Sequence, residues 1–190
     1  LLINGLLLGI AAVGIATAGG SALRARRRPD PDHASLRDHL SENAAAVVGV
    51  GSMALSALSA LAAGSDFLAQ VPAGGVYQQT LWTWMQIGGF APRFGLHLDG
   101  LSVTMLGVIT GVGFFIHLFA SWYMRGESGY ARFFSYMNLF VASMILLVLG
   151  DNLVLLYLGW EGVGICSYLL IGFYYANREN GKAALKAFTV

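Results

Sequence analysis

The stretch from Leu153 to Tyr175, LVLLYLGWEGVGICSYLLIGFYY, decides the fold. It is 23 residues long, and its single charged side chain is Glu161. About 20 apolar residues in a helix cross the hydrocarbon core of a bilayer, which is roughly 30 Å thick. The stretch therefore predicts a transmembrane helix with a carboxyl group inside it.

The composition of the whole chain agrees with a membrane location. Of its 190 residues, 56% are hydrophobic and 11% are charged, whereas soluble domains carry about 25% charged residues. A single cysteine, Cys166, excludes an internal disulfide, and no CxxC motif or His/Cys cluster offers a metal site. We therefore expect an all-α polytopic membrane protein with no redox centre in this chain.

Four further apolar stretches predict helices, and polar segments separate them. We expect the chain to be part of a longer protein, because it stops inside a sixth helical pattern. The expected organisation is a helix over 1–23, an Arg-rich loop over 24–43, a helix over 44–63, an outer loop over 64–100, helices over 101–123, 133–150 and 153–175, and the start of a helix over 182–190.

The basic residues indicate the orientation of these helices. If the Arg-rich loop is cytoplasmic and the chain alternates sides, ten of the eleven basic residues fall in the cytoplasm, as the positive-inside rule requires. Only Arg93 falls outside. The ten are Arg24, Arg26, Arg27, Arg28, Arg37, Arg125, Arg132, Arg178, Lys182 and Lys186.

The outer loop contains a pattern typical of a short β-hairpin. Apolar residues alternate with other residues over 93–98, the segment 81–87 is rich in Trp and Thr, and Gly88 and Gly89 separate the two runs. Trp82 and Trp84 suit the aromatic belt at a membrane surface. We expect the hairpin to lie on the outer face of the membrane.

Small residues mark the faces by which the helices are expected to pack, since close backbone approach drives helix association in lipid. Three such seams are predicted: Gly5, Gly9, Ala12 and Ala16 on the first helix; Ser52, Ser56, Ser59 and Ala63 on the second; Gly107 and Gly111 on the third.

Glu161 is the residue that position alone singles out for chemistry. It lies about eight residues into its helix, within roughly 5 Å of the bilayer centre, where a charged side chain costs about 3 kcal/mol on insertion scales. A carboxyl group that a neighbouring cation approaches and leaves can release and take up a proton. The alternative is a protonated, hydrogen-bonded structural residue. The flanking Gly159, Gly162 and Gly164 would let another helix approach Glu161 closely.

His117 is a second candidate, as a proton relay in the cytoplasmic half of the third helix, because imidazole changes charge near neutral pH. A hydrogen-bonded packing role is the alternative. Asp99 is expected to favour the dipole at the start of the third helix, and Asp151 to be a solvated turn residue. Lys182 and Lys186 are expected to anchor the sixth helix at the interface.

Several motifs resemble one known family. LGDNL at 149–153, the stretch 159–175, LDGLS at 98–102 and SWYMRG at 121–126 are similar to subunit L of bacterial NADH–quinone oxidoreductase, respiratory complex I, and to its mitochondrial counterpart, chain 5. The resemblance is strong over 81–190 and weaker over 44–63. The Arg-rich segment 21–40 departs from the family pattern.

The resemblance implies an antiporter-like bundle, of which this chain holds the first helices. It implies a proton-translocating subunit of the membrane arm, driven by electron transfer from NADH to quinone in other subunits, which hold the flavin and iron–sulfur clusters. No cofactor is implied in this chain. Glu161 matches the family's fifth-helix glutamate, whose lysine partner would lie beyond Val190. Other membrane-arm subunits and lipid are the implied partners. The Gly- and Ala-rich composition favours a bacterial inner membrane over a mitochondrial one.

Two other readings remain open. The chain could belong to a related cation/proton antiporter subunit of the Mrp type or to a hydrogenase membrane subunit, which share the fold and the glutamate. It could also be a membrane scaffold subunit that pumps nothing. The sequence does not decide between H⁺ and Na⁺.

Overall fold

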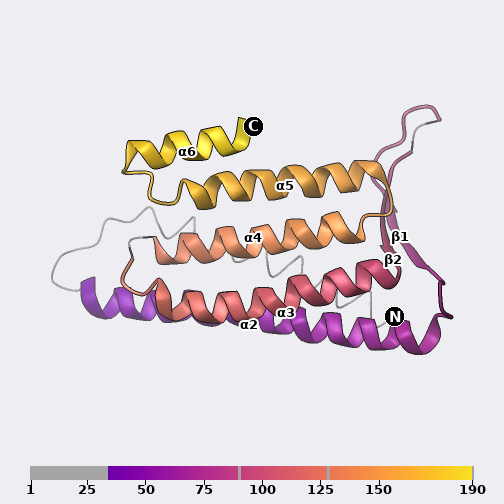
Figure 1. Cartoon of the computed structure of the whole chain (residues 1–190), viewed down its shortest axis with the longest axis horizontal. Helices are drawn as coiled ribbons and strands as arrows, with labels where there is room; N and C mark the ends of the chain where they lie inside the picture. Colours follow the sequence, from indigo (N-terminus) through magenta and orange to yellow (C-terminus); the bar gives the residue numbers. More distant parts are fainter. Residues whose placement is uncertain (1–33, 90, 128, 190) are drawn as a thin grey trace.

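The computed structural model describes residues 34–189, apart from 90 and 128, with side chains from residue 42 onward. Five helices and one β-hairpin make up this part of the chain (Figure 1). The helices run side by side along the long axis, and the hairpin lies across one end. The helix expected over 1–23 and the start of the Arg-rich loop lie outside the described residues.

Helix α2, Ala34–Gln70, is longer than expected at both ends. The loop expected over 24–43 is already helical from Ala34, so the expected helix start at residue 44 is wrong by ten residues. Charged side chains do not stop a helix, and no Pro or Gly follows Pro31 until Gly49. At the far end the helix continues to Gln70 and stops before Pro72. The segment Glu42–Gln70 is long and apolar enough to cross a membrane.

Three more helices have the length and composition of membrane spans: α3, Gly100–Tyr123; α4, Tyr130–Leu149; and α5, Leu153–Ile171. Helix α5 ends four residues before the expected Tyr175, because the N–H of Gly172 closes the last turn on the Tyr168 carbonyl at 3.0 Å and the chain then turns. Helix α6, Arg178–Thr189, begins four residues before the expected start. Within the described residues α2, α3, α4 and α5 are thus the four candidate spans.

The predicted hairpin is confirmed. Strand β1, Tyr77–Thr83, pairs antiparallel with β2, Arg93–Leu98, with a bulge between Thr80 and Trp82. The Trp82 ring stacks on Phe94 at 4.5 Å between centroids. The first strand begins earlier than the Trp-rich run that predicted it and ends at Thr83, so Trp84 lies just beyond the strand, where its N–H donates to the Pro92 carbonyl at 3.0 Å.

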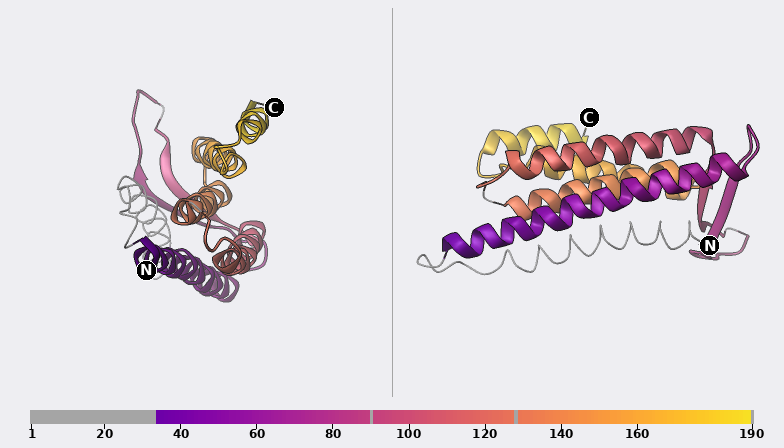
Figure 2. Two further views of the ribbon diagram at one scale, coloured as in Figure 1. Left: turned by 90° about the vertical axis from the view of Figure 1, so that its left-hand side faces the viewer. Right: turned by 90° about the horizontal axis from the view of Figure 1, so that it is seen from below.

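The helices form a curved row in which α4 is central (Figure 2). On one side α4 packs against α2 and α3, and on the other side it packs against α5, which in turn packs against α6. The main apolar core lies between α2, α3 and α4, around Met53, Leu106 and Val141. The described residues thus form one bundle of three helices with α5 and α6 added at its side.

Two expected packing seams can be compared with this core. On α2, Ser56, Ser59 and Ala63 are buried, as the small-residue pattern predicted. On α3 the predicted seam has no partner among the described residues, since a Cβ added at Gly107 or Gly111 would meet no described atom within 4 Å. Helix α3 packs instead through a stripe of larger side chains, Ser102, Leu106, Thr110, His117 and Ala120. The first-helix seam lies outside the described residues.

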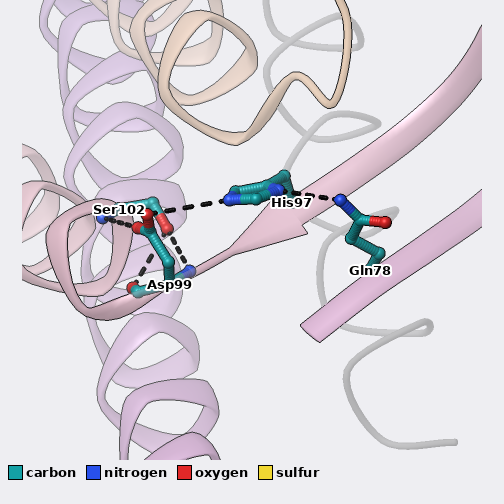
Figure 3. A network of polar contacts seen from close by, with 4 residues as sticks. All are labelled: Gln78, His97, Asp99 and Ser102. Carbon is teal, nitrogen blue, oxygen red and sulfur yellow. Dashed lines mark hydrogen bonds and ion pairs between the residues drawn. The ribbon is translucent and has the colours of Figure 1, made fainter. Parts of the chain in front are cut away.

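Strand β2 connects the hairpin to the start of α3 (Figure 3). Asp99 is the N-cap of α3: the Ser102 N–H donates to its carboxylate at 2.7 Å, and the Asp99 N–H donates to the Ser102 hydroxyl at 2.7 Å. The bond from the Ser102 backbone lowers the pKa of Asp99 below its usual value, and the Ser102 hydroxyl adds to this. The expected structural role of Asp99 at the helix start agrees with this geometry.

His97 joins this cap to β1. The Gln78 side-chain amide donates to His97 Nδ1 at 3.1 Å, which leaves the proton on Nε2, 3.6 Å from the Asp99 carboxylate (Figure 3). The two strands are therefore linked by side chains as well as by the backbone ladder at the point where α3 begins.

Strand β2 also contacts the turn between α4 and α5. The Asp151 N–H donates to the Gly95 carbonyl at 3.3 Å, and the Asn152 side-chain amide donates to the Arg93 carbonyl at 2.7 Å. A Cβ on Gly95 would overlap the Asp151 carboxylate. Asp151 is thus half-buried against the strand, and the expectation of a merely solvated turn residue is wrong.

Candidate functional site

The start of α5 determines the depth of Glu161. Asn152 is the N-cap, and its side-chain oxygen accepts from the N–H groups of Val154 and Leu155, both at 3.1 Å. The same side chain donates to β2 through its amide nitrogen. One residue therefore begins the helix and ties it to the hairpin, with Glu161 nine residues further along the chain.

Two glycines determine which face of α5 meets α4. A Cβ on Gly159 would lie 2.6 Å from the backbone nitrogen of Leu147, and a Cβ on Gly162 would lie 2.5 Å from the Ser143 hydroxyl. Gly164 has no such neighbour among the described atoms. The approach at Gly159 is to backbone atoms and requires glycine, whereas Gly162 packs against the Ser143 side chain, and both residues lie in the contact with α4.

Glu161 lies off this contact. At 3.6 residues per turn it is about 160° around the helix from Gly159. The sequence suggested that the flanking glycines bring another helix close to Glu161. In the structure Gly159 and Gly162 bring α4 to a different face of α5, and Glu161 is turned away from α4. The same stripe of α5 continues through Ile165, Tyr168 and Gly172, and this stripe faces α6.

Helix α6 approaches Glu161 without reaching it. Its side chains Leu185 and Phe188 line an open groove of about 290 Å³ together with Ile165 and Tyr168. Ile165 is one helical turn from Glu161. Figure 1 shows α6 alongside only the part of α5 that is distant from the hairpin. Glu161 is half-buried, one helical turn beyond the residues that line this groove.

Tyr157 is the described side chain that interacts with Glu161. It lies one turn earlier on α5, on the same face of the helix, and its side chain is near the carboxyl group. Sequence reasoning did not select Tyr157, although the i, i+4 spacing on a helix was the available signal. The pair places a hydroxyl beside the one carboxylate in the interior of this span.

His117 occupies a different environment. The side chain is fully buried, and its ring lies 6.1 Å from that of Phe134 on α4, between centroids. Its Nδ1 lies 2.7 Å from the Gly113 carbonyl on the same helix. A Cβ on Gly113 would lie 2.9 Å from the Met53 side chain of α2. His117 therefore faces the junction of three helices.

Two further polar side chains lie at this junction. Asn138 is buried on α4; its amide donates to the Phe134 carbonyl at 2.9 Å, and its oxygen accepts from the Ser52 hydroxyl of α2 at 3.0 Å. We call Ser52, His117, Phe134 and Asn138 the three-helix seam. Sequence analysis missed Asn138, although an amide inside an apolar span was a visible signal.

The structure does not bring the two predicted site residues together. His117 contacts the α2 and α3 side of α4, whereas Glu161 lies on the face of α5 turned away from α4. Lys182 forms an exposed ion pair with Glu179 at 2.8 Å, and Lys186 is exposed in the last turn of α6. In the part of the chain that the structure describes, no three His, Cys, Asp or Glu side chains gather as a metal site would require.

Long apolar helices with a half-buried carboxyl group inside one span define a class, a multi-pass membrane protein with an ionisable group at mid-span. Two family profiles match this chain. The profile described as NADH-ubiquinone oxidoreductase (complex I), chain 5 N-terminus, matches residues 84–134. The profile of the NADH:quinone oxidoreductase/Mrp antiporter transmembrane region matches residues 150–190.

Individual relatives agree. The chain is 69% identical over 154 residues to NADH-quinone oxidoreductase subunit L of Pseudomonas aeruginosa and 63% identical to that of Escherichia coli K12; each match covers 81% of this chain and 25% of the relative. It is 45% identical to NADH-ubiquinone oxidoreductase chain 5 of Dictyostelium citrinum, over 74% of this chain and 20% of that one. The chain belongs to the family of subunit L and chain 5.

A solved structure supports the fold. The structure of the Mrp complex from Dietzia sp. DQ12-45-1b matches 96% of this chain, and 17% of its own, with a TM-score of 0.68 and 25% sequence identity. The antiporter-like fold class is thereby confirmed. The chain spans about a quarter of the length of the subunit L relatives that it matches.

Proposed function

We propose that this chain is the N-terminal part of a proton-translocating subunit in the membrane arm of NADH–quinone oxidoreductase. In this proposal electron transfer from NADH to quinone occurs in other subunits, which hold the flavin and the iron–sulfur clusters. The identity to subunit L relatives supports it, as does the mid-span position of Glu161. The neighbouring membrane-arm subunits and the lipid bilayer are its partners, and a bacterial inner membrane is its location.

The observation that carries the proposal is the placement of Glu161. Its carboxyl group is half-buried on a stripe of α5 that α6 covers only as far as Ile165. The gap leaves room for a cation on a part of the subunit outside this chain. At about 4 Å, and with an effective dielectric constant near 20, such a cation stabilises a carboxylate by about 4 kcal/mol.

This energy is of the size that proton pumping requires. Moving one charge against 100 mV costs about 2.3 kcal/mol. A cation that approaches Glu161 favours the ionised form and releases the proton, and its departure favours uptake. Glu161 is therefore the proton-translocation carboxylate, and His117 is the proposed relay on the opposite side of α4.

The test is a Glu161→Gln variant of the full-length subunit in the intact complex. Glutamine keeps the size of the side chain and removes the ionisable proton. We expect fewer protons pumped per NADH oxidised, with assembly of the complex unchanged. Glu179→Gln is the matched control, because the same change is made at an exposed residue of α6. Normal pumping by the Glu161→Gln complex would favour a scaffold subunit instead.

The likeness to the Mrp complex supports a second candidate, a subunit of a cation/proton antiporter. The two functions differ in their driving force. If the full-length protein exchanges Na⁺ for H⁺ in vesicles without NADH or quinone, the antiporter assignment replaces the first.

A further inference from the structure

The two ring nitrogens of His117 have different surroundings. Nδ1 lies 2.7 Å from the Gly113 carbonyl. Nε2 is fully buried and has no hydrogen-bond partner among the described protein groups. The side chain as a whole is 0% exposed. One nitrogen of a buried ring is thus satisfied and the other is not.

The satisfied bond determines the form of the ring. A carbonyl oxygen only accepts, so Nδ1 must carry the hydrogen. In the neutral ring Nε2 then presents a lone pair and requires a donor. Leaving such a buried group without a partner costs about 1–3 kcal/mol, which is comparable with the effect of a destabilising core mutation.

The nearby side-chain hydroxyls are already in use. The single hydrogen of the Ser52 hydroxyl is shared between the Gly49 carbonyl at 2.9 Å and the Asn138 oxygen at 3.0 Å. The Thr110 hydroxyl, further along the buried stripe of α3, donates to the Leu106 carbonyl at 2.8 Å. None of these hydroxyls therefore supplies a hydrogen to His117 Nε2.

Polar capacity nevertheless remains in the three-helix seam. The Asn138 amide nitrogen carries two hydrogens, and one is donated to the Phe134 carbonyl. The Ser52 oxygen keeps its lone pairs. Phe134 touches this group on several sides: its ring lies beside His117, and its Cδ1 would be 2.5 Å from a Cβ on Gly49 of α2. Phe134 thus lies between α2 and α3, one helical turn from the Asn138 amide that bonds to its carbonyl.

We propose that the three-helix seam is a binding site for one ordered water molecule, which donates a hydrogen bond to His117 Nε2. A buried water makes about three hydrogen bonds to polar groups that lack protein partners. Here the second hydrogen of the Asn138 amide and the Ser52 oxygen are the groups suited to complete its coordination. The water site lies on the opposite side of α4 from Glu161, and it does not depend on the proposed function.

The water site has a consequence for His117 as a proton relay, and this consequence rests on the proposed function. A hydronium ion in the same position would transfer its extra proton to Nε2 and become water again. The ring would then be an imidazolium that donates from both nitrogens. The water is the neighbour that gives Nε2 access to a proton.

The direct test is an electron density or cryo-EM map of the intact complex with the full-length subunit, at a resolution that shows ordered water. We expect a water peak about 2.7–3.2 Å from His117 Nε2. The proposal is overturned if the map shows a protein group at hydrogen-bond distance from Nε2 or a dry contact with apolar side chains.

Two variants sharpen the test. His117→Phe fills the space without a polar atom, and the water peak should disappear while α2, α3 and α4 keep their positions. His117→Gln places an amide near the position of Nε2 and should keep the peak. If the Phe variant does not assemble, the wild-type and Gln maps still decide. A peak that persists in the Phe variant would show that Nε2 does not bind the water.

Proton pumping by the same variants separates the site from the function. We expect pumping per NADH to fall in His117→Phe. A water peak together with normal pumping in His117→Phe would keep the water site and remove His117 from the proposed relay. Normal pumping in Glu161→Gln would instead remove the proposed function and leave the water site standing.

Discussion

His117 and Glu161 are both ionisable groups in the interior of apolar helices, but their surroundings differ. His117 is enclosed by three helices and is 0% exposed, with one nitrogen bonded to its own helix. Glu161 is half-buried on a helix face that its neighbour covers incompletely. The difference arises at α4, because large side chains such as Phe134 pack on one side of it and glycines of α5 pack on the other.

Depth along a helix therefore does not determine the environment of a polar group. Small residues beside Glu161 bring a helix close, but they bring it to the next face of α5. Single substitutions can change the contacts that hold the two helices in place.

The largest effect is expected from Gly159→Ala, which breaks the contact between α4 and α5. The new Cβ would lie 2.6 Å from backbone atoms of Leu147, which have little freedom to move. We expect a loss of about 3 kcal/mol in the free energy of unfolding. It would be measured by unfolding the purified full-length protein in detergent.

Gly164→Ala is the matched control for this substitution. It lies on the same helix, and a Cβ there meets no described atom within 4 Å. Replacing glycine by alanine in a helix interior gains about 0.5–1 kcal/mol. Equal effects of the two substitutions would show that α5 does not meet α4 through Gly159.

A smaller effect is expected from Asn152→Ala, which removes both the N-cap of α5 and its bond to the Arg93 carbonyl. Loss of the cap costs about 1 kcal/mol and loss of the second bond about 1 kcal/mol more. Asn152→Ser keeps a good cap and loses the bond to β2, so it should cost about half as much. If the two variants unfold alike, the bond to β2 contributes nothing.

Asp99→Ala should cost about 1 kcal/mol, because α3 loses its capping box. The effect should depend on pH. The pKa of Asp99 is lowered in the folded protein by the Ser102 N–H, so its carboxylate stabilises the fold above the unfolded pKa of about 3.9. This stabilisation is lost as the pH falls through the folded pKa.

Unfolding measured between neutral pH and acid would test this dependence. The stability difference between wild type and Asp99→Asn, which keeps a capping side chain, should shrink as the pH falls below about 4. A difference that grows in acid would contradict the assignment.

The smallest effect is expected near the start of α4, at the end distant from the hairpin. The Arg132 guanidinium lies 5.2 Å from the Phe173 ring and 4.9 Å from the Tyr175 ring, between its central carbon and the ring centroids. Arg132→Ala should cost about 0.5–1 kcal/mol. Arg132→Lys keeps the cation but not the planar group, and should lose part of this. A Lys variant less stable than the Ala variant would argue against a cation–π contact.

The sequence was sufficient for the four described spans and the hairpin, because apolar runs of membrane length and strict alternation are local signals. It was insufficient for the helix ends. The polar start of α2 has the same charged composition as a loop, and only the absence of Pro and Gly after Pro31 distinguishes it. The early end of α5 depends on the turn at Gly172.

The candidate site was predictable in part. Glu161 and His117 stand out as ionisable residues in apolar spans. Their surroundings were not predictable, because these depend on which face of a helix meets its neighbour. The seam illustrates this: Ser52 and Asn138 are 86 residues apart, and no local pattern pairs them.

The bonds from β2 to Asp151 and Asn152 have a mechanical consequence, since the same strand runs into α3. They join the hairpin ends of α3 and α5, so this end is the natural pivot for a relative rotation of the two helices. His117 is about 26 Å along α3 from its start, and Glu161 is about 12 Å along α5. An equal rotation about this pivot therefore displaces the histidine about twice as far as the glutamate.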